Sequence, residues 1–303
     1  MRRLVYATCL RFESTMPRAT QRRKRPRGFW LHRCFATTCM CFLLAGNGMT
    51  AEWAVDLELV LAADISRSMD LEEAELVRQG FVSAIRHPTV IDAIQRGPLG
   101  RIAVTYLEWG GDQYQRTRVD WAEIADVSSA SAFAEAVEQS SVILVEWTSI
   151  SGAIAFGAQS FEGNGFRGER RIIDISGDGP NNRGVYVINA RDRAVAEGIV
   201  IIGLPIINER LNTYGFPPFP DLDLYYEDCV VGGPGSFIVV ADGFKDFARA
   251  ILHKLVTEIA GRATPLPLLW LAAARPRPPC NAGEIQLQEF LKLQNWPAPL
   301  HDF

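Results

Sequence analysis

The chain has 303 residues, of which 48% are hydrophobic and 22% charged; this composition is typical of a globular protein and excludes a disordered one. Residues 52–303 hold 21 of the 31 basic and 34 of the 35 acidic residues, a formal net charge of −13. Nucleic-acid binding needs a cationic surface, so the acidic body argues against that class and favours cations or other proteins as partners.

The basic N-terminal segment has the order of a secretory signal peptide. Basic residues are concentrated in 16–33, the apolar run "CFATTCMCFLLAG" fills 34–46, and small residues follow at 47–51. The apolar run is shorter than the ~20 residues of a membrane span. We expect residues 1–51 to be a signal peptide cleaved near Ala51, which makes the protein periplasmic or secreted without a stable membrane span. An uncleaved anchor is the alternative.

Strands and helices alternate along the remaining chain. Near-continuous apolar runs predict strands that are buried on both faces, at 57–63, 101–109, 170–176, 199–207 and 236–241. The alternating segment "YQRTRVDW" (114–121) predicts an exposed edge strand that pairs antiparallel with the strand before it. Helical periodicity is found at 71–87, 129–139, 149–161, 188–197 and 243–261.

This order predicts an α/β, Rossmann-like fold, with a mostly parallel sheet, one antiparallel edge strand and helices on both faces. Asp70 and Glu73 have capping-box spacing at the start of the first helix, and Pro88 is expected to end it. We expect one domain over 52–262, with a loop at 208–224. Residues 263–303 are read as a Pro-rich C-terminal appendage that contains one short helix at 284–294.

Oxygen-bearing side chains follow three of the predicted strands or precede their helices. "DISRS" offers Asp64, Ser66 and Ser68 at alternate positions, "EWTSISGA" offers Thr148, and "DISGDGPNN" offers Asp178. Parallel sheets bind ligands at the carboxyl ends of their strands, and hard oxygen ligands suit Mg²⁺ or Mn²⁺. For any one loop taken alone, helix N-capping is the favoured explanation of the same residues, but three such loops together favour a cation.

These residues resemble a known site. D-x-S-x-S after the first strand, a Thr in a later loop and an Asp after a later strand are similar to the metal-ion-dependent adhesion site (MIDAS) of von Willebrand factor type A (vWA) domains. "WTSISGA", "DISGDGPNN" and "DCVVGGPGSF" look closest to a bacterial exported subgroup of unknown function, over roughly residues 54–262.

The resemblance implies roles for these residues. Ser66, Ser68 and Thr148 would coordinate the metal through their hydroxyls, and Asp64 and Asp178 would act largely through water. A protein partner would supply an acidic side chain at the open position, in a contact without turnover. The third loop departs from many relatives because it reads "SGDG" where they have a hydroxyl residue before the Asp-Gly. Ser149 and Ser151 stand close enough to Thr148 to compete for the second-loop position.

Two other functions stay open at this point. A metal-dependent phosphohydrolase would use Asp64 as its nucleophile, although such enzymes place a second Asp where this chain has Ser66. No convincing catalytic motif supports an enzyme. A chaperone-like partner of an ATPase is disfavoured by the leader. The two cysteines beyond the leader, Cys229 and Cys280, form either a disulfide or two separate thiols.

Overall fold

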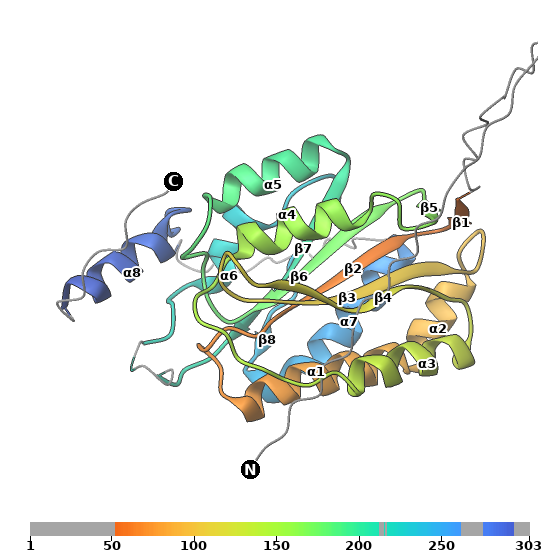
Figure 1. Ribbon diagram of the computed structural model, residues 1–303, viewed down its shortest axis with the longest axis horizontal. Helices are drawn as coiled ribbons and strands as arrows, with labels where there is room; N and C mark the ends of the chain where they lie inside the picture. The colour runs from red at the N-terminus through yellow and green to blue at the C-terminus, as the bar shows by residue number, and fades with distance from the viewer. Residues whose placement is uncertain (1–51, 212–214, 216, 262–274, 294–303) are drawn as a thin grey trace, which may run out of the picture. The chain divides into compact units, whose positions relative to one another are not determined.

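A six-stranded sheet forms the centre of the molecule. The computed structural model describes residues 52–211, 215, 217–261 and 275–293 (Figure 1). The strand order is β4-β3-β2-β6-β7-β8, in which only the β3–β4 pair is antiparallel. The strands are β2 (Glu58–Asp64), β3 (Ile102–Trp109), β4 (Gln115–Ile124), β6 (Arg171–Gly177), β7 (Ile199–Ile207) and β8 (Ala241–Asp242). The predicted mixed sheet with an antiparallel edge strand is confirmed.

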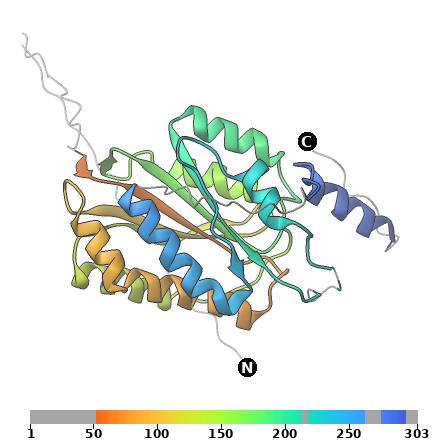
Figure 2. The same cartoon turned by 180° about the vertical axis from the view of Figure 1, so that it is seen from behind.

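Helices cover both faces of this sheet (Figures 1 and 2). Against one face lie α1 (Leu71–Ile85), α2 (Pro88–Gln95), α3 (Val127–Glu138) and α7 (Phe247–Ala260). Against the other lie α4 (Ile150–Ser160), α5 (Val187–Ala196) and α6 (Leu222–Tyr225), followed by a π-helical turn, Tyr226–Val230.

Strand β2 shows why a strand that is covered on both faces is apolar at successive positions. Successive strand side chains point to opposite faces. Leu59 and Leu61 belong to the core under α1 and α7, whereas Val60 and Ala62 belong to the core under α4 and α5. A strand buried on both faces therefore has no polar alternation, which is what the sequence predicted.

Several elements differ from expectation. The short pair β1 (Trp53–Val55) and β5 (Phe166–Gly168) was not predicted, because three-residue strands leave no periodicity to detect. Pro88 does not only end a helix: it begins α2, with His87 as the N-cap. The strand predicted at 236–241 is wrong in extent, since β8 contains only Ala241–Asp242 and Ile238 makes an isolated bridge to Gly203.

The start of α1 answers a question that the sequence left open. Asp70 caps the helix by accepting a hydrogen bond from the Glu73 amide at 2.9 Å, and the Glu73 carboxylate accepts one from the Asp70 amide at 2.9 Å. The predicted capping box is confirmed. The three oxygen-bearing residues that precede it are therefore not required to cap α1.

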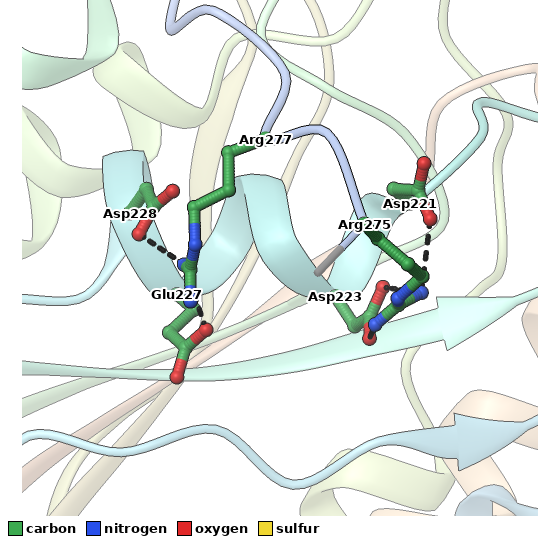
Figure 3. Close-up of polar contacts among 6 residues, drawn as sticks. All are labelled: Asp221, Asp223, Glu227, Asp228, Arg275 and Arg277. Carbon is green, nitrogen blue, oxygen red and sulfur yellow. Dashed lines mark hydrogen bonds and ion pairs between the residues drawn. The ribbon is translucent and has the colours of Figure 1, made fainter. Parts of the chain in front are cut away.

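The C-terminal segment is attached to the body by covalent and ionic links. Cys229 in the π-helical turn is disulfide-bonded to Cys280, which lies just before α8 (Ala282–Leu293). Arg275 pairs with Asp221 and Asp223, and Arg277 pairs with Glu227 and Asp228 (Figure 3). The predicted short helix is confirmed, and the two cysteines are paired.

Two further expectations concern membranes and export. Within the described part of the chain, no helix combines the length and the apolar character needed to cross a membrane. The predicted signal peptide and its cleavage site near Ala51 lie outside the described residues.

Candidate metal centre

The first loop leaves β2 with its oxygens gathered. Asp64 is the last residue of the strand, and its Oδ1 accepts a hydrogen bond of 2.7 Å from the Ser66 amide. The hydroxyls of Ser66 and Ser68 lie 2.8 Å apart. Alternate residues of an extended chain point to the same side, and the contact between the two hydroxyls shows that Ser66 and Ser68 do so.

The second loop turns sharply before α4. Trp147 has a positive φ of 69°, a strained conformation for a bulky residue, and the Arg183 guanidinium stacks on its ring at 4.5 Å. Thr148 follows it. Ser149 then caps α4 by accepting a hydrogen bond from the Gly152 amide at 3.1 Å. Ser149 is thus occupied as a cap, and the Ser151 hydroxyl lies beside it at 3.3 Å. Of these three residues, only Thr148 lines the cavity described below.

The third loop joins the other two. Asp178 follows β6, and its Oδ1 accepts a hydrogen bond from the Ser68 hydroxyl of the first loop. Asn182 accepts a hydrogen bond from the Thr148 backbone amide at 2.9 Å through its side-chain Oδ1. The backbone amide of Asn182 donates to the Thr148 carbonyl at 2.8 Å. Three segments far apart in the sequence therefore meet at one point. The parallel pairing of β2 and β6 places the first and third of them at the same edge of the sheet.

The two carboxyl groups at this point carry an electrostatic cost. Burial, together with the charge of Asp178, raises the pKa of Asp64 well above its usual range. Burial likewise raises the pKa of Asp178 to about 7. Asp64 is 2% exposed, and its Oδ2 finds no hydrogen-bond partner among the described residues. A buried anionic oxygen without a partner costs free energy that a cation would recover.

The donor set fits a hard divalent cation. Two carboxylates and three hydroxyls supply only oxygen, which is the ligand that Mg²⁺ and Mn²⁺ prefer. Among the described residues, no group of three or more His, Cys, Asp or Glu side chains could hold a metal ion. A metal centre in this part of the chain would therefore depend on its hydroxyls, which distinguishes it from a zinc site of the Cys/His type.

A cavity of about 280 Å³ lies over these loops. Ser66, Ser68, Thr148 and Asp178 line it, whereas Asp64 does not. The 217–219 segment and α8 also line it, the latter through Gly283, Gln286, Leu287, Phe290 and Leu291. Further lining residues, several of them charged or polar, come from the three loops and the 208–210 segment: Arg67, Glu146, Trp147, Gly179, Pro180, Asn182, Asn208 and Arg210. Four of the five predicted residues thus share one cavity, and Asp64 lies beneath it, in contact with the first-loop backbone.

Sequence reasoning missed residues around this centre, Tyr226 and Asn181 among them. The buried Tyr226 hydroxyl finds no hydrogen-bond partner among the described residues. A Cβ on Gly177 would lie 2.8 Å from Asp64 Oδ2 and 2.9 Å from that hydroxyl, so the two groups flank the same small space. Asn181 binds the Ser151 amide through Oδ1 at 2.9 Å and the Glu284 carboxyl through Nδ2 at 2.8 Å. The run "GPNN" held a signal for Asn181, but nothing marked Tyr226.

Comparisons with known proteins agree with this architecture. A family model described as "Protein of unknown function (DUF1194)" matches residues 54–263. Proximal thread matrix protein 1 from the mussel byssus, in a structure with a zinc-occupied MIDAS motif, is 14% identical with a TM-score of 0.53, covering 69% of this chain and 49% of that one. A second crystal form of that protein is 16% identical with a TM-score of 0.51, over 69% and 49% of the two chains.

A von Willebrand factor type A protein from Catenulispora acidiphila is 13% identical, with a TM-score of 0.45, over 69% of this chain and 43% of that one. This chain thus spans about half the length of the mussel structures, and the likeness concerns the fold. No curated protein matches the sequence. The vWA-like fold implied by the sequence motifs is confirmed.

Proposed function

The chain belongs to the family described as "Protein of unknown function (DUF1194)", and we propose that it binds a divalent cation at a MIDAS-type site and uses this cation to bind a protein partner. The observation that carries the proposal is the meeting of Ser66, Ser68, Thr148 and Asp178 in one cavity, above the unpaired Asp64 oxygen. The zinc-occupied MIDAS motif of the mussel protein supports it by analogy.

Each residue has a role in this proposal. The hydroxyls of Ser66, Ser68 and Thr148 would contact the cation directly. Asp64 and Asp178 would balance its charge, largely through bound water, with Asp64 also fixing the first loop through the Ser66 amide. Bound metal would supply a positive centre with an open position for one more oxygen. Mg²⁺ or Mn²⁺ is the proposed ion, and an Asp or Glu side chain of the partner is the proposed additional ligand.

The phosphohydrolase alternative is weaker in this geometry. A nucleophilic Asp64 would have to reach a phosphoryl group in the cavity, yet this side chain is 2% exposed and does not line the cavity. Ser66 stands where such an enzyme needs a second carboxylic acid. Beryllofluoride trapping of Asp64, together with turnover of an aryl phosphate, would support the enzyme against the binding module.

Export is part of the same proposal. The disulfide between Cys229 and Cys280 fits an oxidising compartment, and the N-terminal pattern predicts a signal peptide. We therefore propose that residues 1–51 are removed near Ala51 and that residues 52–262 act as the vWA-like domain in the periplasm or outside the cell. N-terminal sequencing of the protein from its native compartment tests this assignment, and an intact leader contradicts it.

A binding experiment with and without metal tests the function. Proteins retained by the immobilised chain in Mg²⁺ and released by EDTA are identified, and one purified partner is then titrated directly. We expect binding to the wild type in Mg²⁺, none in EDTA, and none after the Asp or Glu of the partner that contacts the site is replaced by Asn or Gln. Binding that ignores EDTA contradicts the proposal.

A further inference from the structure

The cavity over the proposed metal site has an apolar side that metal coordination does not use. Besides the oxygen ligands, four large apolar residues line it, which we call the apolar wall: Phe219, Leu287, Phe290 and Leu291. Leu287 and Leu291 are 7% and 8% exposed, yet both lie outside the two hydrophobic clusters of the sheet faces. The cavity lining therefore combines hydroxyls and a carboxyl group with large apolar side chains, and polar residues such as Arg67, Glu146 and Gln286 complete it.

Helix α8 is docked tightly onto the loop that carries Asp178. A Cβ on Gly283 would lie 2.1 Å from the Asn181 carbonyl oxygen, so only glycine permits this approach. Glu284, in the first turn of α8, is 8% exposed and accepts a hydrogen bond of 2.8 Å from Asn181 Nδ2. Because Asn181 also binds the Ser151 amide of α4, the apolar wall and two of the ligand loops share one contact residue.

The segment before α8 is linked to the body of the protein, which holds the α8 residues of the apolar wall in place. The Cys229–Cys280 disulfide fixes the chain two residues before the helix, and the Arg275 and Arg277 ion pairs fix it again slightly earlier (Figure 3). The ion pairs are half-exposed and contribute little by themselves, whereas the disulfide is covalent. The apolar wall is thus a built part of the site.

The size of the cavity limits what can reach the metal. A stable protein–protein contact buries about 800 Å² on each partner, which requires an open face. A cavity of about 280 Å³ is near the lower end of small-ligand sites, which start at about 300 Å³. It has room for an acidic side chain and one large neighbour, but not for the flat surface of a folded domain.

We propose that the partner segment that reaches the cation is an extended one in which the acidic residue stands directly beside a large apolar residue. The carboxylate takes the open metal position, and the apolar side chain packs against Phe219, Leu287 and Leu291. This inference rests on the proposed function, since it assumes a metal-bound acidic group. The inference adds that the residue next to the acidic one is large and apolar, a preference that metal coordination by itself would not produce.

Three capped peptides distinguish binding of the carboxylate by the metal from recognition of the apolar neighbour. They are acetyl-Leu-Asp-Leu-amide, acetyl-Gly-Asp-Gly-amide and acetyl-Leu-Asn-Leu-amide. Each is titrated into the full chain by saturation-transfer NMR, in Mg²⁺ and in EDTA. We expect Leu-Asp-Leu to bind at least tenfold more tightly than Gly-Asp-Gly (about 1.4 kcal/mol), only in Mg²⁺, and Leu-Asn-Leu not to bind.

Two substitutions on α8 provide a matched pair. Leu291→Gln removes apolar wall from the cavity, whereas Leu293→Gln changes the same residue type two positions later, at a side chain that is 83% exposed and outside the cavity. We expect Leu291→Gln to bring the Leu-Asp-Leu affinity down to that of Gly-Asp-Gly and Leu293→Gln to leave it unchanged. If Leu291→Gln does not fold, the relative affinities of the wild type for Leu-Asp-Leu and Gly-Asp-Gly still test the proposal.

The possible failures are distinct. Equal binding of Leu-Asp-Leu and Gly-Asp-Gly in Mg²⁺ overturns the apolar neighbour and leaves the proposed function standing. Binding that is the same in EDTA, or the same with Asn in place of Asp, overturns the proposed function. Absence of binding by all three peptides to the metal-loaded protein contradicts both.

Discussion

Ser68, in the loop after β2, donates a hydrogen bond from its hydroxyl to Oδ1 of Asp178, in the loop after β6. The two residues are 110 positions apart in the sequence. The contact joins two neighbouring parallel strands at their carboxyl ends, and it places a hydroxyl and a carboxyl group within reach of one cation. Thr148 lines the same cavity, so the proposed ligands come from three loops.

The second loop offers adjacent hydroxyls with separable roles. Thr148→Val keeps the shape but removes a proposed metal ligand, and we expect Mg²⁺ affinity to fall at least tenfold with little change in stability. Ser149→Ala removes the N-cap of α4, and we expect a loss of about 1 kcal/mol of unfolding free energy with Mg²⁺ affinity retained. Calorimetry and urea unfolding on both variants check this. The opposite pattern would make Ser149 the ligand.

The strands and helices that position the site could be predicted from the sequence because each is long enough to show its period. β2, β6 and α4 are all predominantly apolar, and the parallel pairing of β2 with β6 places the carboxyl ends of those two strands together. β8 could not be bounded in the same way: most of the apolar run before it lies outside any regular strand, and only Ile238 makes a bridge. Apolarity shows that a segment is covered, but not that it is paired.

The wall over the cavity could not be predicted, because α8 is placed by contacts that depend on three-dimensional proximity. The Gly283 approach to Asn181 and the Glu284 hydrogen bond join residues about a hundred positions apart. Cys229 and Cys280 were the one available signal, and their pairing remained an even choice at the level of sequence. Similarly, the left-handed Trp147 has no local sequence signature, since bulky residues rarely adopt a positive φ.

A buried charged triad holds α7 to the sheet. Lys254 is fully buried and pairs with Asp174 of β6 and with Glu258. Lys254→Met would leave two carboxyl groups buried without their cation, so we expect a loss of about 3–5 kcal/mol in urea unfolding. Adding Asp174→Asn and Glu258→Gln should recover at least half of it. Lys245→Met, at an exposed lysine, is the control and should change stability by about 0.5 kcal/mol or less. An equal loss of unfolding free energy in Lys254→Met and Lys245→Met would show that the buried triad does not stabilise the fold.

Glu108 predicts a specific pH dependence. Burial raises the pKa of this carboxyl to about 7 although Arg118 lies 3.2 Å away. Because the folded-state pKa is above the ordinary value, the protonated form stabilises the fold at acidic pH, and this stabilisation is lost as pH rises through about 7. We expect wild type to lose roughly 2–3 kcal/mol more than Glu108→Gln between pH 5 and pH 8.

Urea unfolding at the two pH values measures the difference between the two proteins, and groups common to both cancel. Glu138→Gln, at a side chain that is 44% exposed, is the matched control and should keep the wild-type slope. Parallel pH profiles for wild type and Glu108→Gln would show that this carboxyl is ionised throughout.

The disulfide should matter for α8 more than for the metal. Replacing Cys229 and Cys280 together by Ser opens a link between residues 51 positions apart, and we expect a loss of about 2–4 kcal/mol of stability. Hydrogen exchange should accelerate in 282–293, whereas Mg²⁺ affinity should change less than twofold, because α8 supplies none of the proposed ligands. Unchanged protection of α8 would show that the Asn181–Glu284 contact holds the helix without the disulfide.

The central claim is that the three loops bind a divalent cation, and calorimetric titration of the purified protein with Mg²⁺ and Mn²⁺ tests it most directly. Asp178→Asn and Asp64→Asn are compared with Asp192→Asn, which changes a carboxylate whose side chain is 67% exposed on α5. We predict one metal per chain for wild type and Asp192→Asn, with binding lost in the other two variants. No binding by wild type, or equal binding by all four proteins, would contradict the claim.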